Sequence, residues 1–134
     1  MTLNNEHLDK QTIKQTGSVY TPLEVVKQML DMVDEEQWRD PHKVFCDPTC
    51  GVGNIIIPML DRRVEFGIEP TVALNTMVGN ELVPKTYEVL MDNLHEWARE
   101  HNVVSTDWEQ NFTNMDFFEW VKLYKSEPVD EFLQ

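Results

Sequence analysis

The stretch Val44-Phe45-Cys46-Asp47-Pro48-Thr49-Cys50-Gly51-Val52-Gly53 decides the fold class of this chain. Its first three residues are a short apolar run, which predicts a buried strand. The two glycines lack a Cβ atom, so the backbone there can turn tightly and pass close to a ligand. The apolar residues of 54–60 then predict a helix packed on a sheet. The stretch is therefore a strand, a turn and the start of a helix.

A helix is predicted before this stretch, from about Pro22 to about Gln37, because apolar residues recur there at helical spacing. Thr21 is a suitable N-cap, Pro22 a suitable first helical residue, and Glu24 completes a capping box. After the stretch, the pattern predicts a strand over 75–80, a helix over 84–100, a third strand near 111–115 or near 103–104, and a short helix over 117–124.

This alternation of strands and helices is typical of an open α/β sheet with parallel strands and right-handed connections. Ligands of such sheets bind beyond the carboxyl ends of the strands. The turn of residues 47–53 follows the first predicted strand directly, so it lies at that end of the sheet. Gly-x-Gly alone is weak support for a ligand site, but Asp-Pro-x-Cys-Gly-x-Gly in this position is far more specific.

Length and charge limit the possible functions. The chain has 134 residues, enough for one domain, and a net charge of −13. Because DNA affinity depends on lysine and arginine contacts with phosphates, this charge argues against DNA binding by this chain alone. Cys46 and Cys50 are expected to be reduced, and no metal-ligand cluster accompanies them. With no predicted membrane span or secretion signal, we expect a cytoplasmic protein.

Asp47 to Gly53 resembles motif I of the adenine-specific (N6) DNA methyltransferases, and Gly17 to Pro22 (GSVYTP) resembles their motif X. Val19 stands where the family usually has an aromatic residue. The resemblance implies a Rossmann-like S-adenosylmethionine-dependent methyltransferase fold, with a truncated parallel sheet and flanking helices. It also implies that S-adenosyl-L-methionine is the cofactor and that the motif X loop closes over its methionine part.

Two further segments resemble this family. Gly79-Asn80-Glu81-Leu82 is similar to motif II, in which an acid accepts hydrogen bonds from the ribose hydroxyls, and a carboxylate has two oxygens for such a diol. Asn114-Met115-Asp116-Phe117-Phe118 is similar to motif III, in which an aspartate accepts from the adenine amino group and an apolar neighbour flanks the ring. Asp107 is the alternative for that aspartate.

The resemblance thus assigns cofactor-binding roles to eleven residues and a catalytic or metal-binding role to none. The eleven are Tyr20, Thr21, Pro22, Asp47, Pro48, Cys50, Gly51, Gly53, Glu81, Asp116 and Phe117. Structural alternatives stay open for six of them, and for two of these, Gly51 and Gly53, the alternative is a plain tight turn. Asp47 could cap the Pro48 turn, Tyr20 could pack on the first helix, Glu81 could be a solvated acid, and Asp116 could cap the helix that begins at Phe117.

The family's catalytic signature, (N/D/S)-P-P-(Y/F), does not occur in this sequence. The resemblance therefore covers the front half of the family's catalytic domain, with a flexible arm at 1–16 and a partial cofactor-binding domain at 17–134. That signature holds the flipped target base, so we expect no catalysis by the chain alone. The strand at 44–46 would then lack a neighbour, which predicts a homodimer or a complementing methyltransferase subunit.

Two other functions remain open. A non-enzymatic interaction or regulatory protein, derived from half a methyltransferase, would bind a partner subunit or sequester the cofactor. A complete small enzyme that acts on something other than DNA is the other alternative, but the sequence offers no nucleophile, base or metal cluster for it.

Overall fold

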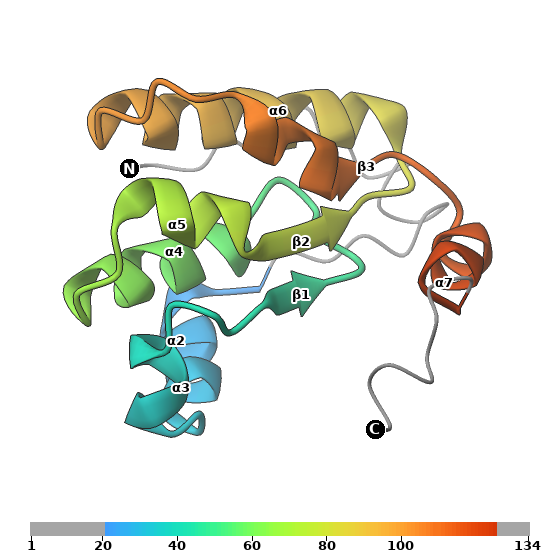
Figure 1. Ribbon diagram of the computed structural model, residues 1–134. Helices are drawn as coiled ribbons and strands as arrows, with labels where there is room; N and C mark the ends of the chain where they lie inside the picture. The colour runs from blue at the N-terminus through green and yellow to red at the C-terminus, as the bar shows by residue number, and fades with distance from the viewer. Residues whose placement is uncertain (1–20, 126–134) are drawn as a thin grey trace.

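A three-stranded parallel sheet forms the centre of the computed structural model, which describes residues 21–125 (Figure 1). The strands are β1 (Phe45–Asp47), β2 (Met77–Asn80) and β3 (Phe112–Thr113), in the order β1-β2-β3. Cys46 is in register with Val78, and Gly79 with Phe112. The predicted α/β class with a small parallel sheet and flanking helices is confirmed, and each predicted strand lies within two residues of an observed one.

The helix after the glycine turn is longer than predicted. α4 (Ile56–Glu65) begins two residues after the predicted start at 54 and continues five residues past Leu60. Pro58 does not break it, because this residue lies in the first turn, where the missing N–H has no helical partner to lose. The turn leads directly into the helix, since Ile57 N donates to Gly53 O at 2.9 Å.

The single helix predicted over 22–37 is wrong: the structure has α2 (Leu23–Asp31) and α3 (Glu35–Arg39) instead. Asp34 has extended backbone angles, φ −59° and ψ 142°, which end the helical path and start a new one. This break lets Trp38 turn inward, where it is buried and stacks on Phe45. The predicted capping box is also wrong, because Pro22 is the N-cap and no side chain caps α2.

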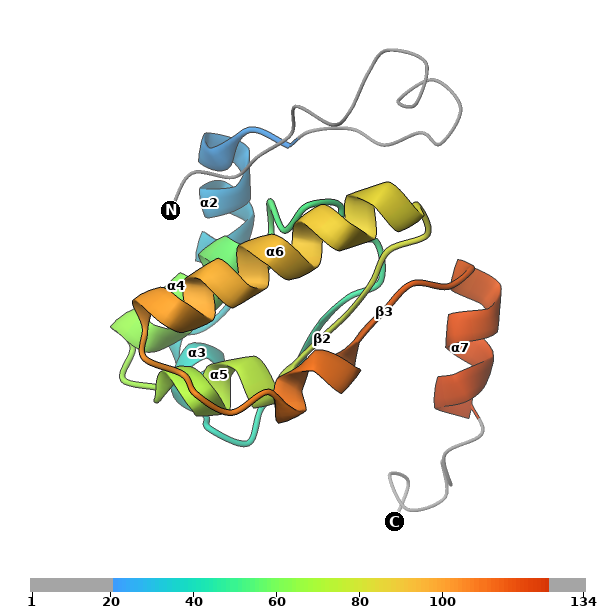
Figure 2. The same cartoon turned by 90° about the horizontal axis from the view of Figure 1, so that it is seen from above.

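The remaining helices are arranged around the sheet as Figures 1 and 2 show. α5 (Pro70–Asn75) leads into β2, and α6 (Pro84–Glu100), whose bounds were predicted correctly, connects β2 to the 3₁₀ helix η1 (Asp107–Asn111) that precedes β3. α7 (Phe117–Lys125) stands beyond the carboxyl ends of the strands, apart from the helices that cover the sheet. The carboxyl edge is therefore bordered by α7 on one side.

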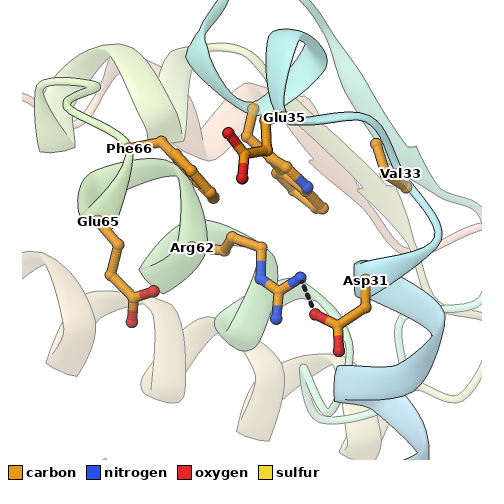
Figure 3. A pocket seen from close by; sticks show the side chains of 7 residues that line it. Asp31, Val33, Glu35, Arg62, Glu65 and Phe66 are labelled. Atoms are coloured by element: carbon orange, nitrogen blue, oxygen red, sulfur yellow. Dashed lines mark hydrogen bonds and ion pairs between the residues drawn. The ribbon is translucent and has the colours of Figure 1, made fainter.

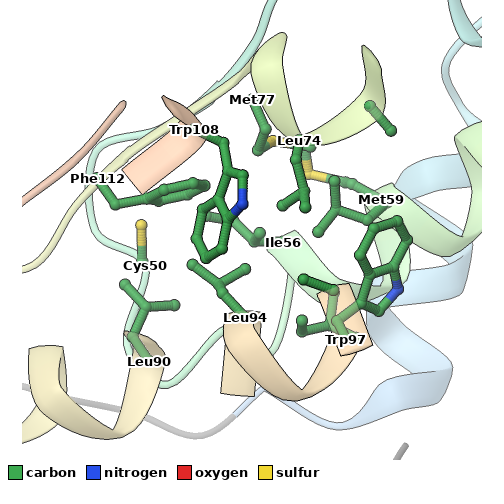
Figure 4. Close-up of a cluster of buried hydrophobic side chains, with 14 of the residues drawn as sticks. Cys50, Ile56, Met59, Leu74, Met77, Leu90, Leu94, Trp97, Trp108 and Phe112 are labelled. Carbon is green, nitrogen blue, oxygen red and sulfur yellow. The ribbon is translucent and has the colours of Figure 1, made fainter. Parts of the chain in front are cut away.

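Aliphatic and tryptophan side chains from α4, α5, α6 and η1 form one buried core against the sheet (Figure 4). Trp97 and Trp108 are almost fully buried, and each indole N–H has an acceptor, Asp61 and the carbonyl of Ser105 respectively. Both tryptophans are therefore core residues with satisfied polar groups. Burial of such large rings contributes several kcal/mol each, of order 3–5 kcal/mol by analogy with truncations to alanine.

A buried arginine holds the amino-end side of the sheet together. Arg63 of α4 has no exposed surface, donates to Thr76 Oγ1 and, at 2.8 Å, to Asp40 O, and lies over the Phe45 ring. Burial lowers the pKa of its guanidinium. The side chain therefore joins α4, the end of α5 and the segment that enters β1.

Among residues 21–125, β1 pairs with β2 alone and so lies at an edge of the sheet. Val44 is 56 % exposed and Cys46 is an exposed free thiol, whereas Cys50 is buried and also free. The arm predicted at 1–16 lies outside the described residues. In the same described part of the chain, no helix has both the length and the apolar character needed to cross a bilayer.

Candidate functional site

The turn after β1 has the backbone that the sequence predicts. Gly51 and Gly53 have φ angles of +56° and +102°, in the region that favours glycine. A Cβ atom placed on Gly51 would meet no atom within 4 Å, whereas one on Gly53 would lie 3.2 Å from Ile57 Cγ1. The space beside the Gly51 Cα atom, where a Cβ atom would lie, is therefore open, and Gly53 serves the packing of the turn on α4.

Two elements distant in sequence hold this turn in place. Cys50 N donates to Asn80 O at 2.9 Å, which joins the turn to the end of β2. Asn93 Nδ2 donates to Val52 O at 2.9 Å, and both groups are buried. The turn is therefore bound to both β2 and α6 before any ligand arrives, and such preorganisation lowers the entropic cost of binding.

The two oxygens of the Asp47 carboxylate, at the end of β1, have different surroundings. Oδ1 accepts from Thr49 N at 3.0 Å, so Asp47 does cap the Pro48 turn, as the structural alternative predicted. Oδ2 is buried and has no hydrogen-bond partner within the described residues. Burial, with a contribution from the Glu81 carboxylate, raises the pKa of Asp47 despite the Thr49 bonds. A buried oxygen with no donor is the part of this turn that a ligand can satisfy.

Glu81 is not a solvated acid, since it is 7 % exposed and lies against the glycine turn. Its Oε1 accepts from Gly51 N at 2.8 Å, and its Oε2 accepts from Val83 N at 2.9 Å. The structure thus brings together two of the predicted site segments, the turn and the end of β2. It also places a carboxylate on the Gly51 N–H, so a ligand oxygen at that amide must displace Glu81.

The segment after β3 is tied to the same end of the sheet. Asn80, which is fully buried, accepts from Thr113 Oγ1 and Met115 N and donates to Met115 O. Asn114 Nδ2 donates to Glu81 O at 2.7 Å. These bonds place the predicted motif III segment next to the predicted motif II segment.

Asp116 and Phe117 begin α7. Asp116 Oδ1 accepts from Phe118 N and Glu119 N, at 3.0 and 3.3 Å, so the N-cap alternative is the arrangement observed. Phe117 is 41 % exposed and forms an edge-to-face pair with Phe118, which is 72 % exposed. Contacts of Asp116 and Phe117 with an adenine ring stay a prediction.

The predicted motif X segment is described only in part. Tyr20 lies outside the described residues, and Thr21 and Pro22 lie at the start of α2. Within residues 21–125, no hydrogen bond joins Thr21 or Pro22 to the glycine turn. A shared site of these two residues with Asp47 and Glu81 stays a prediction.

A surface hollow of about 260 Å³ lies elsewhere, between α2, α3 and the end of α4 (Figure 3). Arg62 and Asp31, which both line this hollow, form an ion pair with 2.7 Å between nitrogen and oxygen. None of the eleven predicted site residues lines this hollow. The described residues also contain no group of three or more histidine, cysteine, aspartate or glutamate side chains that could hold a metal ion.

Three residues that shape the site had no assigned role in the sequence analysis: Asn80, Asn93 and Asn114. A usable signal existed for Asn93, because this amide lies on the apolar face of α6, three residues after Leu90 and four before Trp97. A polar residue in such a row requires a buried partner, and here that partner is Val52 O. Asn80 and Asn114 carry no comparable signal.

Comparison with known proteins agrees with the resemblance. The family model described as N-6 DNA Methylase matches residues 5–123, a range that contains the glycine turn, Glu81 and Asp116. A search of curated protein sequences gave no match. The family match covers far more than half of the 134 residues. This chain therefore belongs to the N-6 DNA methylase family.

Proposed function

We propose that this chain binds S-adenosylmethionine at the glycine turn and forms the cofactor-binding part of an adenine-specific DNA methyltransferase of the restriction-modification type. The observation that carries this proposal is the open space beside the Gly51 Cα atom, in a turn that also holds the buried carboxylates of Asp47 and Glu81. Membership in the family implies use of this cofactor in general. The ring-flanking and methionine-closing roles of Phe117, Asp116, Tyr20, Thr21 and Pro22 belong to the same proposal.

The residues present fit this cofactor. The unpartnered Asp47 Oδ2 accepts a hydrogen bond from an ammonium or hydroxyl group. Glu81 has further lone pairs beyond its two backbone donors, and these suit a ribose diol. The cofactor supplies a methyl group on a sulfonium, while the chain binds and orients it. Acceptance of the methyl group by adenine requires an (N/D/S)-P-P-(Y/F) segment, which these 134 residues do not contain.

Titration calorimetry with S-adenosylmethionine tests the proposal on the full chain. We expect saturable binding at one site, weakened about tenfold or more by Asp47→Ala and by Glu81→Ala, since each variant loses charge-assisted hydrogen bonds. Asp92→Ala, an exposed position on α6, is the matched control and should bind like the parent chain. Absence of binding by a folded parent chain would remove the proposal.

Activity is the second arm of the test. We expect no methylation of DNA by the chain alone and methylation when a separate polypeptide with the missing signature is added. Methylation by the chain alone would contradict the assignment of a cofactor-binding part.

An interaction role is the second candidate, and it is favoured by the edge of β1 that no strand among residues 21–125 pairs with. An unpaired strand edge offers backbone donors and acceptors to another chain, and natural proteins usually cover such edges. The exposed side chains of Val44 and Cys46 flank this edge. The partner would be a second copy or a complementing methyltransferase subunit, in the cytoplasm. Native mass spectrometry that finds only monomers at micromolar concentration, with no partner recovered from cells, would count against this role.

A further inference from the structure

We draw no further inference here: the strongest candidate, the surface hollow between α2, α3 and the end of α4, already has its Asp31 and Glu35 carboxylates paired with arginines of the same chain, and nothing among residues 21–125 shows which ligand would occupy it.

Discussion

Gly79→Ala tests how closely β2 must approach the glycine turn. Gly79 lies in the middle of the sheet, and a Cβ atom there would lie 2.3 Å from Cys50 Sγ, 2.9 Å from Ile56 Cδ1 and 3.0 Å from Phe112 Cδ1. Ordinary contacts between such atoms are about 3.5 Å or more. The sulfur cannot retreat freely, because Cys50 is buried and its thiol donates to Asp47 O at 3.2 Å. The new methyl group would therefore push the turn away from the strand.

The magnitude follows from two opposing effects. Overpacking in a well-packed core costs about 1–3 kcal/mol. Alanine in a strand recovers about 0.5–1 kcal/mol of backbone entropy relative to glycine. The contact with Cys50 is far inside the normal range, so the upper part of the first interval applies. We expect the free energy of unfolding to fall by about 2 kcal/mol.

A double-mutant cycle identifies the cause. Cys50→Ala removes the sulfur that makes the closest contact, so Gly79→Ala should cost at least about 1 kcal/mol less in the Cys50→Ala background. The free energy of unfolding is measured by urea denaturation. Gly51→Ala is the comparison: its cost comes from a positive φ with no neighbour within 4 Å, and Cys50→Ala should not change it. A cost of Gly79→Ala that is the same in both backgrounds would refute the steric explanation.

Arg63→Ala should lower the free energy of unfolding by about 3 kcal/mol, since it leaves the Asp40 carbonyl and the Thr76 hydroxyl without their donor. Arg63→Met, which fills the same space, should recover part of that loss in urea denaturation. Equal stability of Arg63→Ala and the parent chain would contradict this role. The raised pKa of Asp47 predicts that stability depends on pH. Its pKa in the folded state lies above the 3.8 of an exposed aspartate, so the folded state binds the proton more tightly than the unfolded state. The free energy of unfolding therefore falls as pH rises from 3.8 through the pKa of the folded state. Asp47→Asn cannot titrate, so its free energy of unfolding relative to the parent chain should increase as pH is raised from about 4 to about 7, and a difference that does not change with pH would count against burial as the cause.

The local elements of this fold follow from nearby residues. The bounds of α6 are readable because Pro84 opens a long amphipathic pattern that decides the buried face without help from other elements. The turn at 51–53 is readable because only glycine adopts its positive φ angles without strain. The division of 22–37 into α2 and α3 could not be predicted from that segment, because it depends on burial of Trp38 against Phe45, which lies outside it.

Residue types and their order, by themselves, determined the α/β class, the position of the glycine turn at the carboxyl end of β1, and the candidate acids Asp47 and Glu81. Only the tertiary structure decided what those acids touch. The bond from Gly51 N to Glu81 spans thirty residues, and that from Asn93 to Val52 spans forty-one. Such contacts depend on how strands and helices are placed relative to one another, because no local pattern records which distant donor a buried acceptor will meet.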